Sequence, residues 1–343
     1  MLKRTMSLAA ACLLALGAPA QAQTRIVANC FFPPQHFVCA EVLAGWAEDV
    51  ARVTEGRVRV TTPARSMAPP PEQLASVRGG VFDAGFQFNG FIADEIVGPA
   101  VSLQPFTATG DARANSVALW RTYETYLADA DEFSGVQLLG LFVAPGVDLY
   151  AMQEPPITSL EDLQRRRMWA APGVTARILR DIGSPVVSGP AVQMTELIQR
   201  GVVDGYVGIP ASDAVAFNVL PYARSATRTQ AKISAPSFSF FVSQAVWERI
   251  VESDRAAILS VSGEAFAERA GLAWAGAESR ALISMSEALS VPVIDASEEF
   301  EAALRAAAEP FAEEWIAAAN ARGIDAAAAL EFYRSTAQSL AEY

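Results

Sequence analysis

Few residues of this sequence have the types and spacing that catalysis needs. His36 is the only histidine, and no G-x-S-x-G elbow, G-x-G-x-x-G turn, phosphate loop, H-E-x-x-H helix or C-x-x-C pair occurs. The acidic pairs Glu161-Asp162, Glu298-Glu299 and Glu313-Glu314 are typical of solvated helix faces. These observations disfavour hydrolase, nucleotide and zinc chemistry, and they predict no catalytic residue, metal or cofactor.

Aromatic and polar residues instead gather where predicted strands end. They are Gln87, Asn89, Phe91, Asp148, Tyr150, Trp169 and Phe238. Open α/β sheets bind ligands outside the carboxyl ends of their strands. Any one of these side chains also suits a core or loop position, but their recurrence at corresponding ends of two sheets predicts a ligand cleft between two lobes.

Strands alternate with helices twice along the chain, which predicts parallel α/β sheets. The first series has strands at 25–30, 57–62 and 84–88, with helices from Val38 to Gly56 and over 72–78. The second opens with a capping box at Thr158 to Glu161 and continues through strands at 167–170, 185–188 and 206–209, with helices over 174–182 and 192–200. Each series predicts one lobe.

A short quasi-repeat supports two similar lobes. Residues 80–86 read Gly-Val-Phe-Asp-Ala-Gly-Phe and residues 201–207 read Gly-Val-Val-Asp-Gly-Tyr-Val, each between an amphipathic helix and a strand. Glycine closes the helix and aspartate turns the chain into the strand. A structural role therefore explains both copies at least as well as a ligand role.

The C-terminal third predicts helices. One periodic stretch over about 253–290 would be roughly 57 Å long at 1.5 Å per residue, enough to bridge both lobes. Shorter helices should follow Ser297, interrupted at Pro310 and Gly323. A long helix either pairs two subunits or braces one, so a homodimer is left open. We expect lobe I over 23–147 plus about 236–275, and lobe II with the C-terminal helices over 148–235 plus about 276–343.

The N-terminus has the charged, apolar and small-residue order of a secretory signal peptide over 1–22. Lys3-Arg4 precede an apolar run over 6–18, and Ala20-Gln21-Ala22 predict cleavage near Ala22. The run is about a dozen residues, whereas a bilayer crossing needs roughly 20. Cleavage removes two cations and no acid, so the net charge of −12 becomes −14, which makes nucleic acid a poor partner. We expect a soluble periplasmic protein.

Two cysteines, Cys30 and Cys39, survive this cleavage. An even pair in an oxidising compartment indicates a disulfide that closes a short loop between the first strand and the first helix. The alternative is two buried free thiols, because sequence does not show whether the Cα atoms come within roughly 7 Å of each other.

Nearly the whole chain after residue 22 resembles the substrate-binding component of a TRAP (tripartite ATP-independent periplasmic) transporter of the DctP-like family. The motifs that carry the resemblance are Trp46, 56–58, 72–83, the Leu-Gln-Pro-Phe of 103–106, 156–163, Pro172-Gly173 and 201–205. It implies a two-lobed periplasmic binding fold with a long connecting helix. It also implies that the protein captures a small organic solute and delivers it to the membrane subunits of such a transporter.

The sequence departs from the family where ligand anions are usually held. Trp169 stands where the resemblance implies a carboxylate-binding arginine, Asp148 where a second arginine often occurs, and Val207-Gly208 where a Glu-Asn pair is frequent. A tryptophan cannot replace the two parallel hydrogen bonds of an arginine fork. Trp169 is therefore expected to stack on a flat, apolar or cationic ligand, unless it is a core residue, and Asp148 to accept from an amine or hydroxyl.

These departures predict an aromatic, apolar, polyhydroxylated or amine-bearing solute in place of a plain dicarboxylate. Two other readings stay open at this point. A binding module that reports to a sensor kinase would have the same sequence features. A periplasmic enzyme with cleft carboxylates as acid and base is disfavoured by the single histidine.

Overall fold

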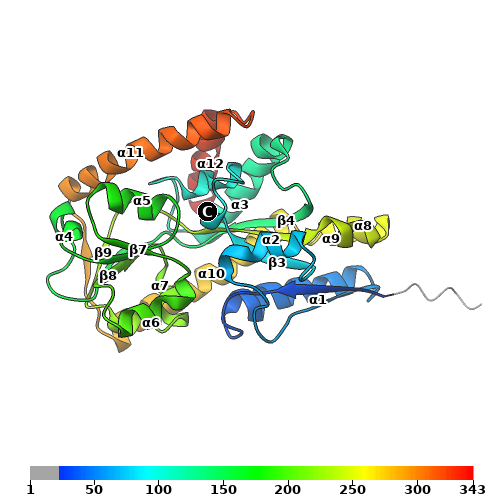
Figure 1. Cartoon of the computed structure of the whole chain (residues 1–343), viewed down its shortest axis with the longest axis horizontal. Helices are drawn as coiled ribbons and strands as arrows, with labels where there is room; N and C mark the ends of the chain where they lie inside the picture. Colours follow the sequence, from blue (N-terminus) through cyan, green and yellow to red (C-terminus); the bar gives the residue numbers. More distant parts are fainter. Residues whose placement is uncertain (1–22, 343) are drawn as a thin grey trace, which may run out of the picture.

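The computed structural model describes residues 23–342, which form two lobes side by side, each built on its own β-sheet (Figure 1). The signal peptide expected over 1–22 lies outside the described residues. The first sheet has the order β2-β1-β3-β10-β4 and the second the order β11-β9-β5-β8-β6-β7. The first sheet comprises β1 (Thr24–Asn29), β2 (Val58–Thr61), β3 (Ala84–Phe88), β4 (Val136–Val143) and β10 (Ser237–Ser243). The second comprises β5 (Leu149–Ala151), β6 (Met168–Ala170), β7 (Val186–Ser188), β8 (Gly205–Val207), β9 (Ser225–Arg228) and β11 (Val293–Asp295).

Helices pack around both sheets. The α-helices of the described chain are α1 (Ala44–Val53), α2 (Gln73–Arg78), α3 (Ala112–Thr122), α4 (Leu160–Gln164), α5 (Val174–Asp181), α6 (Met194–Gln199), α7 (Ala211–Ala216), α8 (Gln244–Arg249), α9 (Glu252–Leu259), α10 (Glu264–Ile283), α11 (Glu298–Asn320) and α12 (Ala326–Ala341). The 3-10 turns are η2 (Pro70–Glu72), η3 (Asn89–Phe91), η4 (Gly98–Leu103), η6 (Ala128–Ala130), η7 (Ala191–Gln193) and η8 (Leu220–Tyr222). The π-helical turns are η1 (Val38–Leu43), η5 (Tyr123–Leu127) and η9 (Ser284–Ala288).

The predicted alternation of strands and helices is present in both lobes, but neither sheet is wholly parallel. β10 runs antiparallel to both β3 and β4, and β5 runs antiparallel to both β8 and β9. Both strands follow a crossing of the chain from one lobe to the other. The sequence pattern predicts the strand–helix–strand units within each lobe. It does not predict the direction of a strand that follows a crossing between lobes.

The core of the first lobe is built from aromatic rings on β10 and its neighbours. Every residue of β10 is buried, and Phe240 stacks on Phe266 of α10 with ring centroids 4.9 Å apart. Trp46 of α1 meets Phe240 edge-on at 4.8 Å. Burying a large apolar side chain contributes about 1.5–3 kcal/mol, so this packing fixes α1 and α10 against the sheet.

The long helix expected over 253–290 is broken. α9 ends at Leu259 and α10 begins at Glu264, because Gly263 adopts a φ of +61° and donates its N–H to the carbonyl of Leu139 in β4. α10 continues into η9, and this stretch packs on α3 and β4 of the first lobe and on α7 of the second. The predicted bridge between lobes is therefore present, with a shorter helix.

A second bridge is α11, which runs without interruption through Pro310. Pro310 and Ala306 are exposed, so water can solvate the carbonyl that the proline leaves without a donor. α11 packs on α4 and α5 of the second lobe, while its Trp315 Nε1 donates to the carbonyl of Val97 in the first lobe at 2.9 Å. The predicted interruption at Gly323 is present, with a φ of +81°.

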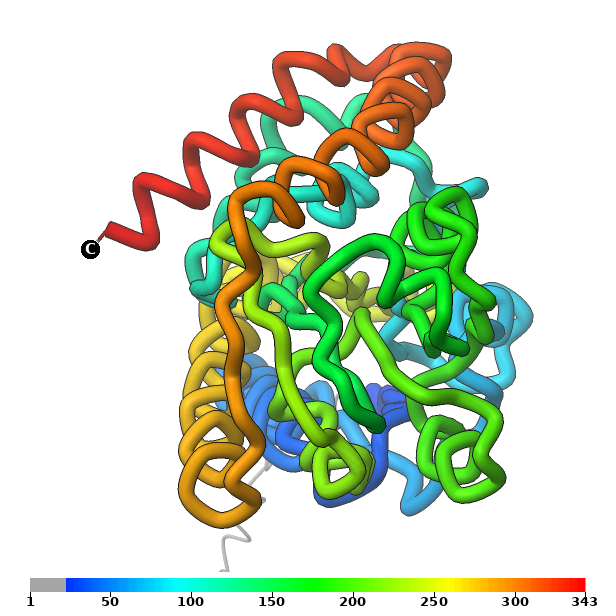
Figure 2. Tube along the Cα trace, turned by 90° about the vertical axis from the view of Figure 1, so that its left-hand side faces the viewer, coloured from blue at the N-terminus to red at the C-terminus, as the bar shows by residue number. Residues whose placement is uncertain are grey.

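The last helix lies with the first lobe. α12 packs on α3 and on the end of α11, and Figure 2 shows the two helices, orange and red, together along the upper side of the molecule. The sequence placed all of 276–343 with the second lobe, because nothing in the periodicity of α12 indicates which lobe receives its apolar face.

The helix cap predicted at Thr158 to Glu161 is shifted by one residue. Ser159 is the N-cap of α4 and its hydroxyl accepts from the N–H of Asp162 at 3.2 Å. The Asp162 carboxylate accepts in return from the N–H of Thr158 at 2.9 Å. Aspartate thus takes the role that the sequence assigned to Glu161.

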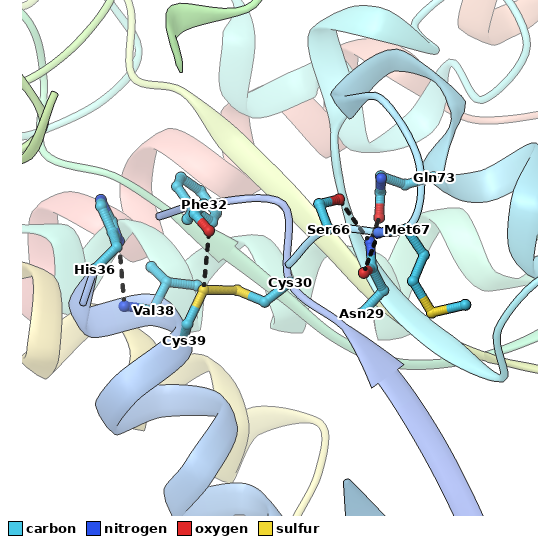
Figure 3. The surroundings of a disulfide bond; sticks show 9 residues. All are labelled: Asn29, Cys30, Phe32, His36, Val38, Cys39, Ser66, Met67 and Gln73. Atoms are coloured by element: carbon cyan, nitrogen blue, oxygen red, sulfur yellow. Dashed lines mark hydrogen bonds between the residues drawn. A yellow bond between two sulfur atoms is a disulfide. The ribbon is translucent and has the colours of Figure 1, made fainter. Parts of the chain in front are cut away.

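Cys30 and Cys39 form a disulfide with Cα atoms 5.9 Å apart (Figure 3). The sequence left open whether the two cysteines are bonded or are free thiols, and the structure has the disulfide. The bond closes the loop between β1 and η1. Asn29 anchors the strand end on the other side, since its side chain bonds Gln73 at 2.7 Å and the Met67 N–H at 2.9 Å.

Candidate ligand-binding site

A cavity lies between the two lobes, at the edge where the carboxyl ends of β3, β6 and β8 meet the start of β10. Its interior leaves about 50 Å³ for water-sized molecules, and its total empty volume of about 460 Å³ includes space that is open to solvent. The first lobe contributes Phe31, Phe32, Pro70, Phe88, Phe91, Pro236 and Phe238. The second lobe contributes Trp169, Ala171, Pro172, Gly189, Pro190, Ala191, Val192, Gly208, Ile209, Asp213 and Phe217.

Phe238 organises the aromatic wall of the first lobe. Its ring lies 5.5 Å from that of Phe88, 5.6 Å from that of Phe32 and 5.3 Å from that of Trp274 behind it. Phe91 meets Phe88 edge-on at 5.3 Å. Such contacts at 4.5–7 Å contribute roughly 0.5–1.5 kcal/mol each beyond area burial, so the rings hold one another in place. Two of the residues expected at the cleft, Phe91 and Phe238, are part of it.

Trp169, also expected at the cleft, lines the cavity from the second lobe. Its side chain is 1% exposed, and its Nε1 has no hydrogen-bond partner among the described residues. Arg167, two residues earlier, points to the outside and forms an ion pair with Asp204 at 2.6 Å. No lysine or arginine is among the described residues that line the cavity.

Gln87 and Asn89 do not line the cavity, although the sequence predicted both as ligand contacts. The Gln87 amide accepts from the Leu74 N–H at 3.1 Å and donates to the carbonyl of Pro70 at 3.1 Å. Asn89 donates to the Ser237 hydroxyl at 3.0 Å. Both amides are buried and engaged behind the wall, where they hold Pro70 and the start of β10 in place.

Asp148 and Tyr150 also lie away from the cavity. Asp148 forms an ion pair with Lys232 at 2.5 Å, and burial raises the pKa of Asp148 although Lys232 acts in the opposite direction. Tyr150 is buried in the second sheet and stacks on Tyr206 with centroids 4.5 Å apart. The sequence could not supply Lys232 as the partner of Asp148, because the two lie 84 residues apart.

A histidine–aspartate pair that the sequence did not predict joins the two lobes beside the cavity. His36, in the disulfide-closed loop of the first lobe, places Nε2 3.2 Å from Oδ1 of Asp213 in α7 of the second lobe. His36 is 2% exposed and Asp213 3%. With 177 residues between them, no spacing rule brings the two together.

α7 is held in turn by Glu278 of α10. The Glu278 carboxylate accepts from the N–H groups of Ala211 and Ser212 at 3.1 and 2.7 Å. Burial raises the pKa of Glu278 above its ordinary value, and the charge of nearby Asp213 adds to the increase. Glu278 is thus a buried acid whose ionised form costs free energy in the folded protein.

Glu278→Gln should therefore gain stability relative to the wild type as the pH rises from about 4.5, the ordinary pKa of this group. Between that value and the raised pKa, Glu278 binds more protons in the folded state than in the unfolded chain, so its contribution to the wild-type free energy of unfolding falls with rising pH. The variant has no group that titrates at this position. Urea unfolding followed by circular dichroism from pH 4.5 to 7.5 measures the difference, and a difference that is constant with pH would contradict the assignment.

Two further findings concern the described part of the chain. Within residues 23–342, none of the helices combines the length and the apolar composition that a membrane crossing requires. Over the same residues, histidine, cysteine, aspartate and glutamate form no cluster that could hold a metal ion.

Comparison with known proteins places this geometry in context. The family model of bacterial extracellular solute-binding protein, family 7, matches residues 31–318. The outer membrane transporter protein TsaT of Comamonas testosteroni is 36% identical over 329 residues, which are 96% of each chain.

Solved structures match over 92% of the chain. A TRAP periplasmic solute-binding protein from Bordetella bronchiseptica, with bound (R)- and (S)-mandelate, superposes with a TM-score of 0.86 at 27% identity and covers 92% of this chain and 99% of that one. A marine metagenome TRAP solute-binding protein in complex with 3-hydroxybenzoate superposes with a TM-score of 0.83 at 23% identity and covers 92% and 98%. At that identity, the second likeness concerns the fold alone.

Proposed function

The chain belongs to family 7 of the bacterial extracellular solute-binding proteins, the solute-binding component of TRAP transporters, and we propose that its solute is a small aromatic compound held by ring contacts. The observation that carries this proposal is the wall of the interlobe cavity. Six phenylalanines and Trp169 line it, together with four prolines and no described lysine or arginine.

The wall favours an aromatic ring over an aliphatic dicarboxylate for an energetic reason. Transfer of a carboxylate out of water costs several kcal/mol unless hydrogen bonds or an opposite charge replace its hydration. A dicarboxylate would need two such replacements, and the position where an arginine was expected holds Trp169. An aromatic ring instead gains area burial and edge or face contacts with the surrounding phenylalanines.

A relative supports the same class of ligand. The Bordetella bronchiseptica protein, 27% identical over nearly the whole chain, holds mandelate, in which a phenyl ring carries one carbon with a hydroxyl and a carboxylate.

We further propose that the protein works in the periplasm after cleavage near Ala22, and that it releases its solute unchanged. Lys3-Arg4, the apolar run over 6–18 and Ala20-Gln21-Ala22 support export. Intact mass of the protein from a periplasmic extract should correspond to a chain that begins at Gln23. Mass spectrometry of an aromatic solute after incubation should recover it without a product.

The test of the ligand class is a thermal-shift and calorimetry screen of the purified mature protein. The aromatic set is mandelate, phenylacetate, benzoate and benzyl alcohol, and succinate and malate represent dicarboxylates. A ligand at 100 times its Kd adds about 2.7 kcal/mol to the free energy of unfolding, so at least one aromatic compound should raise Tm while the dicarboxylates do not. Micromolar binding of succinate, unchanged in Trp169→Ala, would refute the proposal.

Phe91→Ala should weaken the tightest aromatic ligand of that screen about tenfold, since an aromatic contact of roughly 0.5–1.5 kcal/mol is lost together with buried area. Phe91 is half-buried at the cavity, so the fold should tolerate the change. Phe332→Ala is a matched control, because Phe332 is half-buried against Tyr126 at 5.4 Å and is not a cavity residue. Calorimetry should give wild-type affinity for the control, and equal losses in both variants would count against the ring contact.

A further inference from the structure

We infer that Asp213 recognises a hydrogen-bond donor, a hydroxyl or amino group, on the aromatic solute. The inference rests on the proposed function and adds the polar half of the ligand to it. Asp213 is the one carboxylate among the described residues that line the cavity, and it is 3% exposed.

Half of the Asp213 carboxylate is left for a ligand. Oδ1 bonds the His36 ring at 3.2 Å, while within residues 23–342 no side-chain or backbone donor bonds Oδ2. An ionised carboxylate has about four acceptor positions, and a ligand that displaces water from Oδ2 without donating to it would leave some of them unfilled, which costs free energy. A ligand O–H or N–H directed at Oδ2 removes that cost.

His36 keeps Asp213 in the acceptor state. The N–H of Val38 donates to Nδ1 of His36 at 3.3 Å (Figure 3), so the ring proton lies on Nε2 and is donated to Oδ1 of Asp213. Phe32 and Phe37 stack on the ring at 4.4 and 4.5 Å and fix its plane. In this arrangement the Asp213 carboxylate acts as an acceptor, and Asp213 lines the cavity.

The rest of the wall cannot take over this role. Its other polar side chain is Trp169, whose indole N–H is a donor and has no partner in the described chain. A donor on the ligand thus meets a side-chain acceptor at Asp213 alone, and the donor should decide which aromatic compounds bind best.

Two sets of ligands test the effect of this donor group. Within each set the aromatic ring is the same and the molecules are similar in size. Benzylamine and benzyl alcohol are compared with toluene, and mandelate is compared with phenylacetate, which differs from it only in the hydroxyl. Calorimetry on the mature protein should give a donor advantage of at least tenfold in Kd. An advantage absent from both sets would overturn the inference, whatever the affinity of the ring itself.

Asp213→Asn removes the acceptor with little change of shape. If the amide oxygen keeps the bond to His36, its NH2 group replaces Oδ2 and cannot accept from an ammonium or hydroxyl. A donor advantage seen in the wild type should fall to less than threefold, with toluene and phenylacetate unaffected. An advantage that survives the substitution, or an equal loss for every compound, would assign Asp213 a structural role only.

Folding of the variant is checked by Tm and circular dichroism. Asp213→Leu, which has no hydrogen-bonding group, serves as the second variant if Asp213→Asn is unstable. Asp254→Asn is the matched control, because Asp254 is a carboxylate 2% exposed that pairs with Arg57 at 2.9 Å, away from the cavity. It should keep the wild-type donor advantage. If no aromatic compound binds and succinate does, the proposed function itself fails, which is a different result from ring binding without a donor advantage.

Discussion

Gly90→Ala should weaken binding of the aromatic solute by roughly tenfold to a hundredfold. A Cβ on Gly90 would lie 2.6 Å from the carbonyl oxygen of Pro172 and 2.4 Å from the ring of Phe88. Gly90 belongs to the first lobe and Pro172 to the second, so the methyl group would stand in the contact that closes the cleft. Overpacking of a tight contact costs about 1–3 kcal/mol, and each 1.4 kcal/mol is tenfold in Kd.

Calorimetry with mandelate or benzyl alcohol measures the loss, and small-angle scattering with and without ligand measures closure. The variant should remain more open than the wild type in the presence of ligand, because two lobes around a cleft close by hinge motion. Gly110→Ala is the control, since a Cβ there meets no atom within 4 Å. Wild-type affinity and closure in Gly90→Ala would show that the lobes do not need this contact.

The overall fold follows closely from the sequence where the signals are local. Alternating strands and helices, the glycine that ends each unit and the cysteine pair each depend on residues close together in the chain. The sequence does not show the break before α10, because Gly263 starts that helix by bonding Leu139, which is more than a hundred residues earlier. The helical periodicity over 253–290 does not predict that hydrogen bond.

Only the apolar residues of the candidate site could be predicted from the sequence. Trp169, Phe91 and Phe238 were found because large aromatic residues at strand ends favour a cleft, and all three line the cavity. The polar residues that were predicted beside them bond other parts of the chain, such as Lys232 for Asp148 and Leu74 for Gln87. Which way a polar side chain points depends on such tertiary partners, and the sequence does not give them.

The loop closed by the disulfide connects fold and site. Phe31 and Phe32 line the cavity from within this loop, and His36 holds Asp213 from the same loop. Residues inside a short closed loop lose less conformational entropy on binding than residues of an open one. The bond should therefore contribute to ligand affinity as well as to stability.

Replacing both Cys30 and Cys39 with alanine should lower the free energy of unfolding by about 2.5 kcal/mol, the loop-closure value for residues nine apart. For a chain of this size the corresponding decrease in Tm is about 4 °C. Affinity for the aromatic solute should fall as well, by roughly threefold to tenfold, because the two phenylalanines and His36 must then be ordered on binding.

The wild type treated with a reductant should reproduce both effects, since Cys12, the third cysteine of the sequence, lies in the segment expected to be removed. Thermal unfolding gives the first effect and calorimetry the second. A decrease in Tm with unchanged affinity would mean that the loop is ordered by Phe238 and Trp274 without the bond. A loss of affinity that a higher concentration of ligand does not offset would instead indicate that the unbridged loop occupies the cavity, because a weaker site still saturates whereas a blocked one does not.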